Sequence, residues 1–96
     1  MPTYVSLCRY TEQGIKNIKE SPSRLERVKQ GLRALGGELK SFHLTQGKYD
    51  AVVIVELPND EAVAKFALST GSQGNVRTET FRAFTEDEYR KIISGL

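Results

Sequence analysis

One short apolar run constrains the fold more than any other part of this 96-residue sequence. Ala51-Val52-Val53-Ile54-Val55 contains no polar side chain, and it follows the turn Gln46–Asp50. Gly47 suits that turn, because glycine adopts backbone conformations that other residues avoid. A strand that is apolar on both sides is normally covered on both faces. We therefore expect this run to be a central strand of its sheet.

The rest of the pattern predicts three more strands and three helices. The strands are expected at residues 4–10, 38–45 and 76–84, and the helices at 21–35, 59–70 and 85–93, with a short turn around Ile15 and Ile18. Ser21 is expected to cap the first helix, with Ser23 and Glu26 as a second choice. Gly71 is expected to end the second helix, and Thr85 with Glu88 to form a capping box on the third. The threonine- and charge-rich strand 76–84 suits a sheet edge.

This order, β-α-β-β-α-β with a terminal helix, is the ferredoxin-like pattern of an α+β fold. It predicts a four-stranded antiparallel sheet with helices on one face, and a single domain spanning residues 1–96. The other face of the sheet would be bare and would include part of the apolar run. Since monomers rarely expose a large apolar patch, we expect a homodimer or higher homo-oligomer that packs sheet against sheet or closes a barrel.

Alternation assigns side chains to the two faces of the strands. Tyr4 and Ser6 share a half-polar face, which we interpret as a cleft or an interface. In strand 38–45, the alternation places Leu39, Ser41 and His43 on one face. A binding pocket lined by Tyr4, Ser6, His43 and Tyr49 is therefore expected between the bare sheet face and a neighbouring chain.

Charge and composition exclude several classes of binding partner. The net charge of +2 gives no concentrated basic face, which argues against nucleic acid. The single cysteine, Cys8, excludes an intrachain disulfide. No apolar run approaches the roughly 20 residues that a membrane span needs, and no secretory leader is visible. A cytoplasmic protein without membrane contact is expected.

Several short motifs together resemble one family. Gly47-Lys48-Tyr49-Asp50 is similar to the Gly-x-Tyr-Asp signature of the GYD-domain family. Residues 11–16, Ser21-Pro22, residues 74–78 and residues 82–86 support the resemblance in order along the chain. The resemblance implies a fold like that of the dimeric α+β barrels. It implies no reaction, because the family has no established biochemical role.

His43 and Cys8 depart from the family pattern, which would lead us to expect an aromatic and a larger aliphatic residue there. His43 can act as a general base or a metal or haem ligand, but it has no cysteine or carboxylate at ligand spacing. We therefore expect a hydrogen-bonded strand residue, with no metal and no cofactor. Cys8 is interpreted as a small buried hydrophobe, because Arg9 points to the opposite face and cannot activate it.

Two further groups of polar residues are candidate binding sites. Asp50 can accept a proton and Tyr49 can donate a hydrogen bond to a ligand, although both also fit structural roles in the turn. Asn75 and Arg77 follow a glycine-containing loop, and Arg77 can grip a carboxylate or phosphate. Alternatively, Arg77 pairs with a carboxylate of its own chain or of a partner.

Two functional hypotheses follow. The first is a small-molecule-binding or assembly domain without a catalytic motif. The second is a cofactor-independent oxygenase or isomerase of the dimeric α+β barrel type, with His43 or Asp50 as the base. An enzyme needs a cavity with a perturbed acid or base inside it, whereas a binding protein needs only the cavity. The sequence leaves both open.

Overall fold

The computed structural model describes residues 1–96. The elements are β1 (Thr3–Tyr10), α1 (Glu12–Lys16), a short 3₁₀ helix (Ile18–Glu20), α2 (Ser21–Ala34), β2 (Glu38–Leu44), β3 (Ala51–Glu56), α3 (Asp60–Ser72), β4 (Val76–Ala83) and α4 (Glu86–Ser94). The sheet has the order β2-β3-β1-β4, and all neighbouring strands are antiparallel. The predicted ferredoxin-like α+β fold is confirmed, with β3 central and β4 at an edge.

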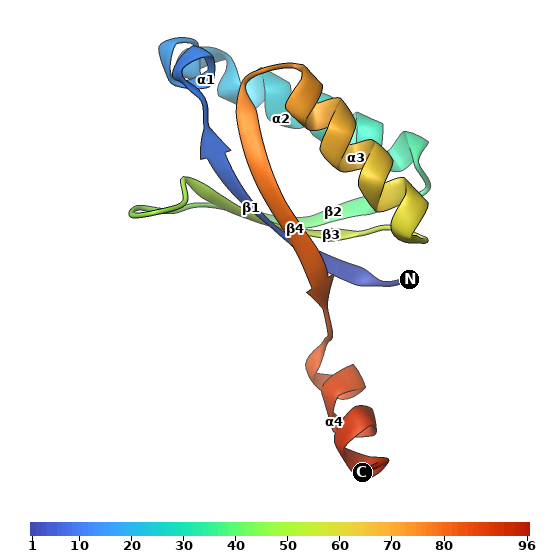
Figure 1. The fold of residues 1–96 in the computed structure, drawn as a ribbon. Coiled ribbons are helices and arrows are strands. Elements are labelled where there is room, and N and C mark those ends of the chain that lie inside the picture. The colour runs from blue at the N-terminus through green and yellow to red at the C-terminus, as the bar shows by residue number, and fades with distance from the viewer.

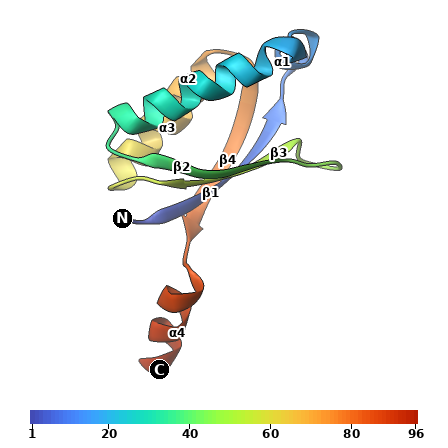
Figure 2. The same ribbon diagram turned by 180° about the vertical axis from the view of Figure 1, so that it is seen from behind.

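The core lies between the sheet and helices α2 and α3, which cover one of its faces (Figures 1 and 2). Its members are Tyr4, Leu32, Val53, Val55, Leu57, Ala62 and Phe66. They come from the apolar stripes of the two helices, from alternate residues of the central strands and, in the case of Leu57, from the residue just after β3. Full burial of side chains of this kind stabilises a fold by about 1.5–3 kcal/mol each.

Three local predictions are wrong. The pairing of β2 with β3 shifts between Leu39 and Ser41, and this bulge places Leu39 against the core while Ser41 and His43 face the other way. Ser21 does not cap α2 but is its first residue. Gly71 lies inside α3, which continues to Ser72. A bulge adds one residue to a strand and therefore reverses the faces that simple alternation assigns.

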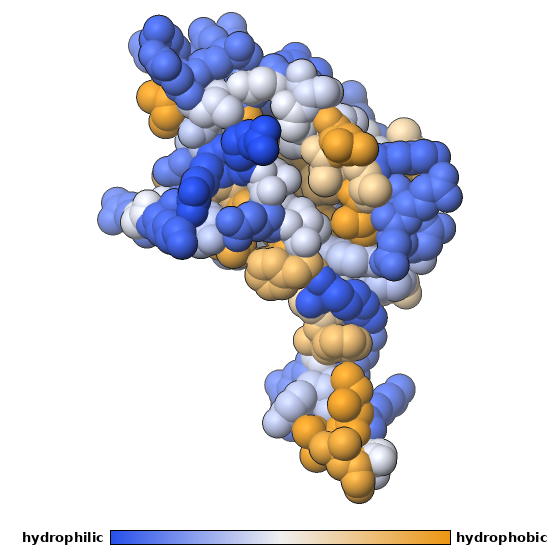
Figure 3. Space-filling view, in the orientation of Figure 1, coloured by the Kyte–Doolittle hydropathy of each residue, from blue (hydrophilic) through white to orange (hydrophobic).

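The last helix stands apart from the rest of the molecule. The predicted capping box is confirmed: the Glu88 backbone N–H donates to Thr85 Oγ1 at 3.2 Å, and the Thr85 N–H donates to Glu88 Oε1 at 2.9 Å. The helix projects beyond the end of β4, on the side of the sheet opposite α2 and α3 (Figures 1 and 2). Apolar atoms gather on its surface (Figure 3). None of the helices combines the length and apolar character needed to cross a membrane.

Candidate functional site

Apolar side chains occupy the centre of the sheet face that α2 and α3 leave uncovered. Val5 pairs with Ile54 and Phe81, and Leu7 pairs with Val52 in the next row. Directly paired residues of antiparallel strands point to the same face. We call this surface, with these five residues at its centre, the open face. None of the five was among the predicted site residues, although the alternation in β1 contained the signal.

Tyr49 lies at one end of the open face and is held by charged neighbours. Its hydroxyl donates to Glu79 Oε2 at 2.9 Å. The Arg9 guanidinium carbon lies 4.8 Å from the centroid of its ring, and Lys48 Nζ lies 5.7 Å from it. These distances are in the range of cation–π contacts. The ring is therefore a fixed platform between one acidic and two basic side chains.

Arg77 lines a shallow depression together with Tyr49, Arg9 and Glu79. It is exposed and makes no ion pair in the chain, so none of the predicted intrachain partners of Arg77 is found. Arg9 lies directly opposite Arg77 in the β1–β4 pairing. Like charges in that arrangement disfavour the folded state. The structure thus brings Tyr49 and Arg77 together but leaves a positive pair without an internal counterion.

His43 lies at the other edge of the sheet. It is exposed on β2, paired with Val52, whereas Arg77 belongs to the opposite edge strand β4. No hydrogen bond to its ring is found within the chain. His43 and Arg77 therefore do not share a site in one copy of the chain.

Asp50 has a structural position in the turn before β3. Its carboxylate accepts from the Tyr10 backbone N–H at 2.9 Å, and its own N–H donates to the Cys8 carbonyl at 2.8 Å. Its carbonyl accepts from the Thr45 N–H at 2.9 Å. Gly47 in this turn has φ +112°, a conformation that favours glycine. The residue thereby holds the end of β1 to the turn and to β2.

Asn75 lies outside the open face, where it joins the start of β4 to α1. Its side-chain oxygen accepts from Gln13 Nε2 at 3.0 Å, and its carbonyl accepts from the Thr11 N–H at 3.0 Å. A Cβ on Gly14 would overlap that carbonyl, which explains why glycine fits there. The contacts assign Asn75 a structural role, and ligand binding by it stays a prediction.

Tyr4 and Ser6 lie on the covered face, so they cannot line a pocket on the open face, and that part of the prediction is wrong. They are only 5% and 1% exposed. The Ser6 hydroxyl lies 3.0 Å from Thr80 Oγ1. Tyr4 donates to Asp60 Oδ1 at 3.1 Å. Burial raises the pKa of the Tyr4 phenol, and the hydrogen bond and negative charge of Asp60 raise it further.

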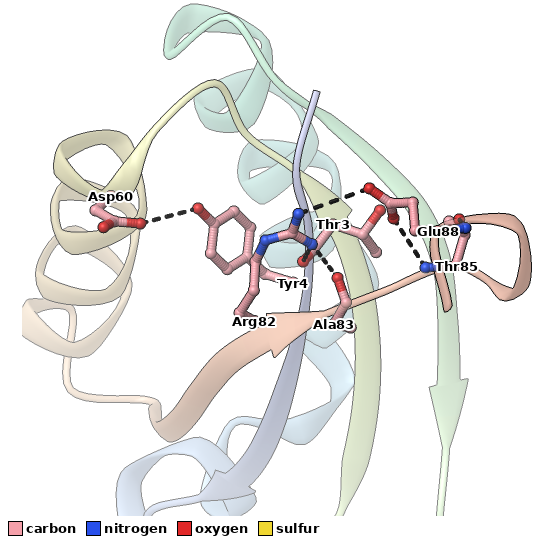
Figure 4. Close-up of polar contacts among 7 residues, drawn as sticks. All are labelled: Thr3, Tyr4, Asp60, Arg82, Ala83, Thr85 and Glu88. Atoms are coloured by element: carbon pink, nitrogen blue, oxygen red, sulfur yellow. Dashed lines mark hydrogen bonds and ion pairs between the residues drawn. The ribbon is translucent and has the colours of Figure 1, made fainter. Parts of the chain in front are cut away.

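Arg82, which the sequence analysis did not single out, connects this region to α4 (Figure 4). Its guanidinium donates to the carbonyls of Thr3, at 3.1 Å, and Ala83, and lies 3.7 Å from the Glu88 carboxylate. The hydrogen bond from the Thr85 N–H lowers the pKa of Glu88, and Arg82 lowers it further. One cation thus ties the start of β1, the end of β4 and the first turn of α4 together.

A small cavity of about 80 Å³ lies between the sheet and the helices. Cys8, Ser6, Thr78 and the apolar side chains of Val28 and Phe66 contribute to its wall. Burial raises the pKa of the Cys8 thiol, which opposes the thiolate form that nucleophilic or redox chemistry needs. Cys8 is half-buried, close to the small hydrophobe that was expected. Pockets for ordinary ligands measure roughly 300–1,000 Å³, so this cavity is too small for one.

The candidate chemical groups stand apart from one another. No three histidine, cysteine or carboxylate side chains come close enough to hold a metal ion. Asp50 is engaged by backbone groups, and His43 stands alone on an edge strand. The open face offers an apolar centre with charged side chains at its margin, which is how protein interfaces are built.

Comparisons with known proteins agree with this architecture. The model of the GYD domain family matches residues 4–93. A Thermus thermophilus protein named "glutamine synthetase and cystathionine beta-lyase binding protein" is 33% identical over 84 residues, which cover 86% of this chain and 88% of that protein.

Three solved structures share the fold. The crystal structure of FFRP-DM1 matches with a TM-score of 0.60 and 20% identity, covering 88% of this chain and 100% of that one. A hypothetical protein of Pyrococcus horikoshii has a TM-score of 0.51 and 21% identity, with coverages of 90% and 93%. A protein of Thermus thermophilus has a TM-score of 0.51 and 24% identity, with coverages of 88% and 95%. With the family model matched along nearly all of its length, this chain belongs to the GYD domain family.

Proposed function

We propose that this chain is a non-catalytic binding protein that self-associates through its open face and, once assembled, binds a partner enzyme. The observation that carries the proposal is the row of Val5, Ile54 and Phe81, over which no helix or strand of the chain packs. Phe81 is 49% exposed, and Val5 and Ile54 are half-buried. Exposed apolar patches of this kind mark interaction sites in soluble proteins.

The relative from Thermus thermophilus supports the second half of the proposal, because its name describes a protein that binds two enzymes. It aligns with 86% of this chain, so the comparison includes the sheet and not just one motif. We propose that the partner here is an enzyme of the same kind, a glutamine synthetase or a cystathionine β-lyase.

Self-association is tested by sedimentation velocity at micromolar concentration. The wild-type chain is expected to sediment as a dimer or larger. Phe81→Asp is expected to sediment as a monomer, because a dimer of this variant would have to bury an unpaired carboxylate in its interface. Leu68→Asp is the matched control, since Leu68 is 74% exposed on α3, on the other side of the sheet. A monomeric wild type, or equal effects of the two substitutions, contradicts the proposal.

Enzyme binding is tested separately by titrating the chain into purified glutamine synthetase and cystathionine β-lyase of the same organism in a calorimeter. A saturable heat with either enzyme, unchanged by Leu68→Asp, supports the proposal. No binding to either enzyme, with self-association intact, removes the enzyme-partner half and leaves an assembly domain.

The second candidate is the binding of a small carboxylate or phosphate between Arg9 and Arg77. The facing positive charges favour it, because an anion between them would offset their repulsion. In an NMR titration with inorganic phosphate at constant ionic strength, the Arg77 side-chain signal is expected to shift. Arg77→Ala is expected to abolish the response and Arg90→Ala to preserve it, since Arg90 already pairs with Glu86.

The enzymatic alternative has less support in the geometry. Asp50 as a base would have to give up its hydrogen bond to the Tyr10 N–H, which holds the end of β1. His43 has no partner to orient its ring, and orientation by a third group is the usual arrangement for a catalytic histidine. The acid and base pair that such chemistry requires is not assembled in one copy of the chain.

A further inference from the structure

Helix α4 extends away from the body of the molecule. It makes no extensive contact with any other element. The radius of gyration is 14.3 Å, against about 12.5 Å for a compact chain of this length. The longest dimension of the molecule is 49 Å and the shortest 17 Å. The helix is therefore an arm, and it points to the same side of the sheet as the open face (Figures 1 and 2).

One side of this arm is apolar and uncovered (Figure 3). Tyr89, Ile92 and Ile93 recur at helical spacing and are 58%, 47% and 47% exposed, and Leu96, two residues beyond the end of the helix, is 95% exposed. An isolated helix of nine residues is only marginally stable in water, and amphipathic helices gain their stability by packing. This helix has nothing to pack on in its own chain, so its apolar side fits a surface supplied by another molecule.

The direction of the arm is fixed by polar contacts at its base (Figure 4). Arg82 donates to Thr3 and Ala83, pairs with Glu88 in the first turn of α4, and stacks 4.4 Å from the centroid of the Phe84 ring. Fixing a binding element before association lowers the entropy lost on binding. Arg82 is thus a positioning residue for α4.

We propose that α4 is an intersubunit arm, whose apolar side packs against the second copy of the chain that covers the open face. The inference rests on the self-association proposed above, and it adds the element that completes the interface. A two-fold axis would place both arms in equivalent positions, so every contact made by the arm is made twice.

The exposed apolar area is the argument for a second copy as the occupant. Phe81 and Phe84 are 49% and 55% exposed and the other apolar side chains of the open face are half-buried, so together they present on the order of 300–400 Å². A stable interface buries about 800 Å² per partner, of which roughly 65%, or about 520 Å², is apolar in homodimers. The apolar side of α4 with Leu96 adds roughly 450 Å². The apolar surface of the open face alone therefore falls short of what a stable homodimer buries, and the open face with the arm exceeds it.

The test uses substitutions that add the same single negative charge to opposite sides of α4. Ile92→Asp alters the apolar side, and Ser94→Asp alters the polar side, where the Ser94 hydroxyl donates to the Lys91 carbonyl. Sedimentation equilibrium is expected to give Ile92→Asp a dimer dissociation constant at least about a hundredfold higher than that of the wild type, because the lost contact occurs twice. Ser94→Asp is expected to change the dimer dissociation constant less than about threefold.

A second measurement separates an interface from a folding defect. Below the concentration at which dimers form, Ile92→Asp and wild type are expected to unfold at the same urea concentration, since Ile92 is already exposed in the single chain. In the wild type, hydrogen exchange of the α4 amides is expected to slow as protein concentration rises, while exchange in α2 stays constant.

The outcomes distinguish this inference from the proposal beneath it. If Phe81→Asp abolishes the dimer and Ile92→Asp leaves it intact, the arm inference is overturned and self-association through the open face stands. If neither substitution changes the association state, both are overturned. If Ile92→Asp spares the dimer but abolishes enzyme binding, the occupant of the arm is the foreign enzyme and the inference is again overturned.

Discussion

On the covered face of the sheet, Tyr4 and Ser6 are buried with their hydroxyls paired, whereas Val5 and Leu7 on the same strand have no helix above them. The more polar alternation thus faces the core, and the more apolar one faces outward. A buried hydroxyl is tolerated when it is hydrogen-bonded, and both of these are. An apolar side chain over which nothing packs can be removed from water only by another molecule, so the difference between the faces points to a partner.

The largest expected effect separates the faces with one type of substitution. Phe66→Ala on the covered side is expected to lower the free energy of unfolding by about 3–5 kcal/mol, because Phe66 is 6% exposed in the core. Phe81→Ala on the open face is expected to cost less than about 1 kcal/mol in the monomer, because Phe81 is already half exposed. Urea unfolding of dilute protein measures both, and equal losses would remove the distinction between the faces.

Two arginines offer a smaller and electrostatic version of the same comparison. Arg24 is 9% exposed and donates to the carbonyls of Asn17, at 2.9 Å, and Gly14, at 3.4 Å. Arg24→Met, which keeps the length of the side chain, is expected to cost about 1–3 kcal/mol by leaving these acceptors unpaired. Arg77→Met is expected to change unfolding by no more than about 0.5 kcal/mol. A large loss for Arg77→Met would show that Arg77 has an internal partner.

Alkaline pH is expected to weaken the covered face. Burial raises the pKa of Cys8 and Tyr4 above their ordinary values of 9.0 and 10.0, so above those values the unfolded chain binds fewer protons than the folded chain. The free energy of unfolding therefore falls as pH rises from about 9 upward. Tyr4→Phe and Cys8→Ala together are expected to flatten this decline in urea unfolding series. If the free energy of unfolding still falls at alkaline pH in the double variant, other titrating groups cause the fall.

The smallest expected effect concerns the base of the arm. The pKa of Glu88 is lowered, mainly by the hydrogen bond from the Thr85 N–H and further by Arg82. The stabilisation that ionised Glu88 gives to the base of α4 is therefore present above the ordinary pKa of 4.5 and is lost as pH falls below it. The ¹³Cα shifts of α4 are expected to move toward coil values in acid while those of α2 do not. Glu88→Gln is expected to remove this pH dependence, and simultaneous loss of both helices would contradict it.

Much of the fold follows from local patterns in the sequence. The capping box at Thr85 and Glu88 and the central position of the Ala51–Val55 run were both predictable, since each depends on neighbouring residues or on burial of a whole run. The bulge after Leu39 was not, because alternation carries no mark of the extra residue. The candidate site was equally hard to predict. Tyr49 and Arg77 line one depression, but they belong to separate sequence motifs, and neither motif indicates that the two residues meet.

The elements, their order and the apolar character of the uncovered sheet face follow from residue type and spacing, because these features depend on neighbouring residues along the chain. Which face of the sheet the helices cover and where the last helix points could be read only from the folded molecule. Those two choices depend on long-range contacts, such as the hydrogen bond from Tyr4 to Asp60 and the clamp of Arg82 on Thr3 and Glu88. They place the open face and the arm on one side of the molecule, where a second copy can meet both.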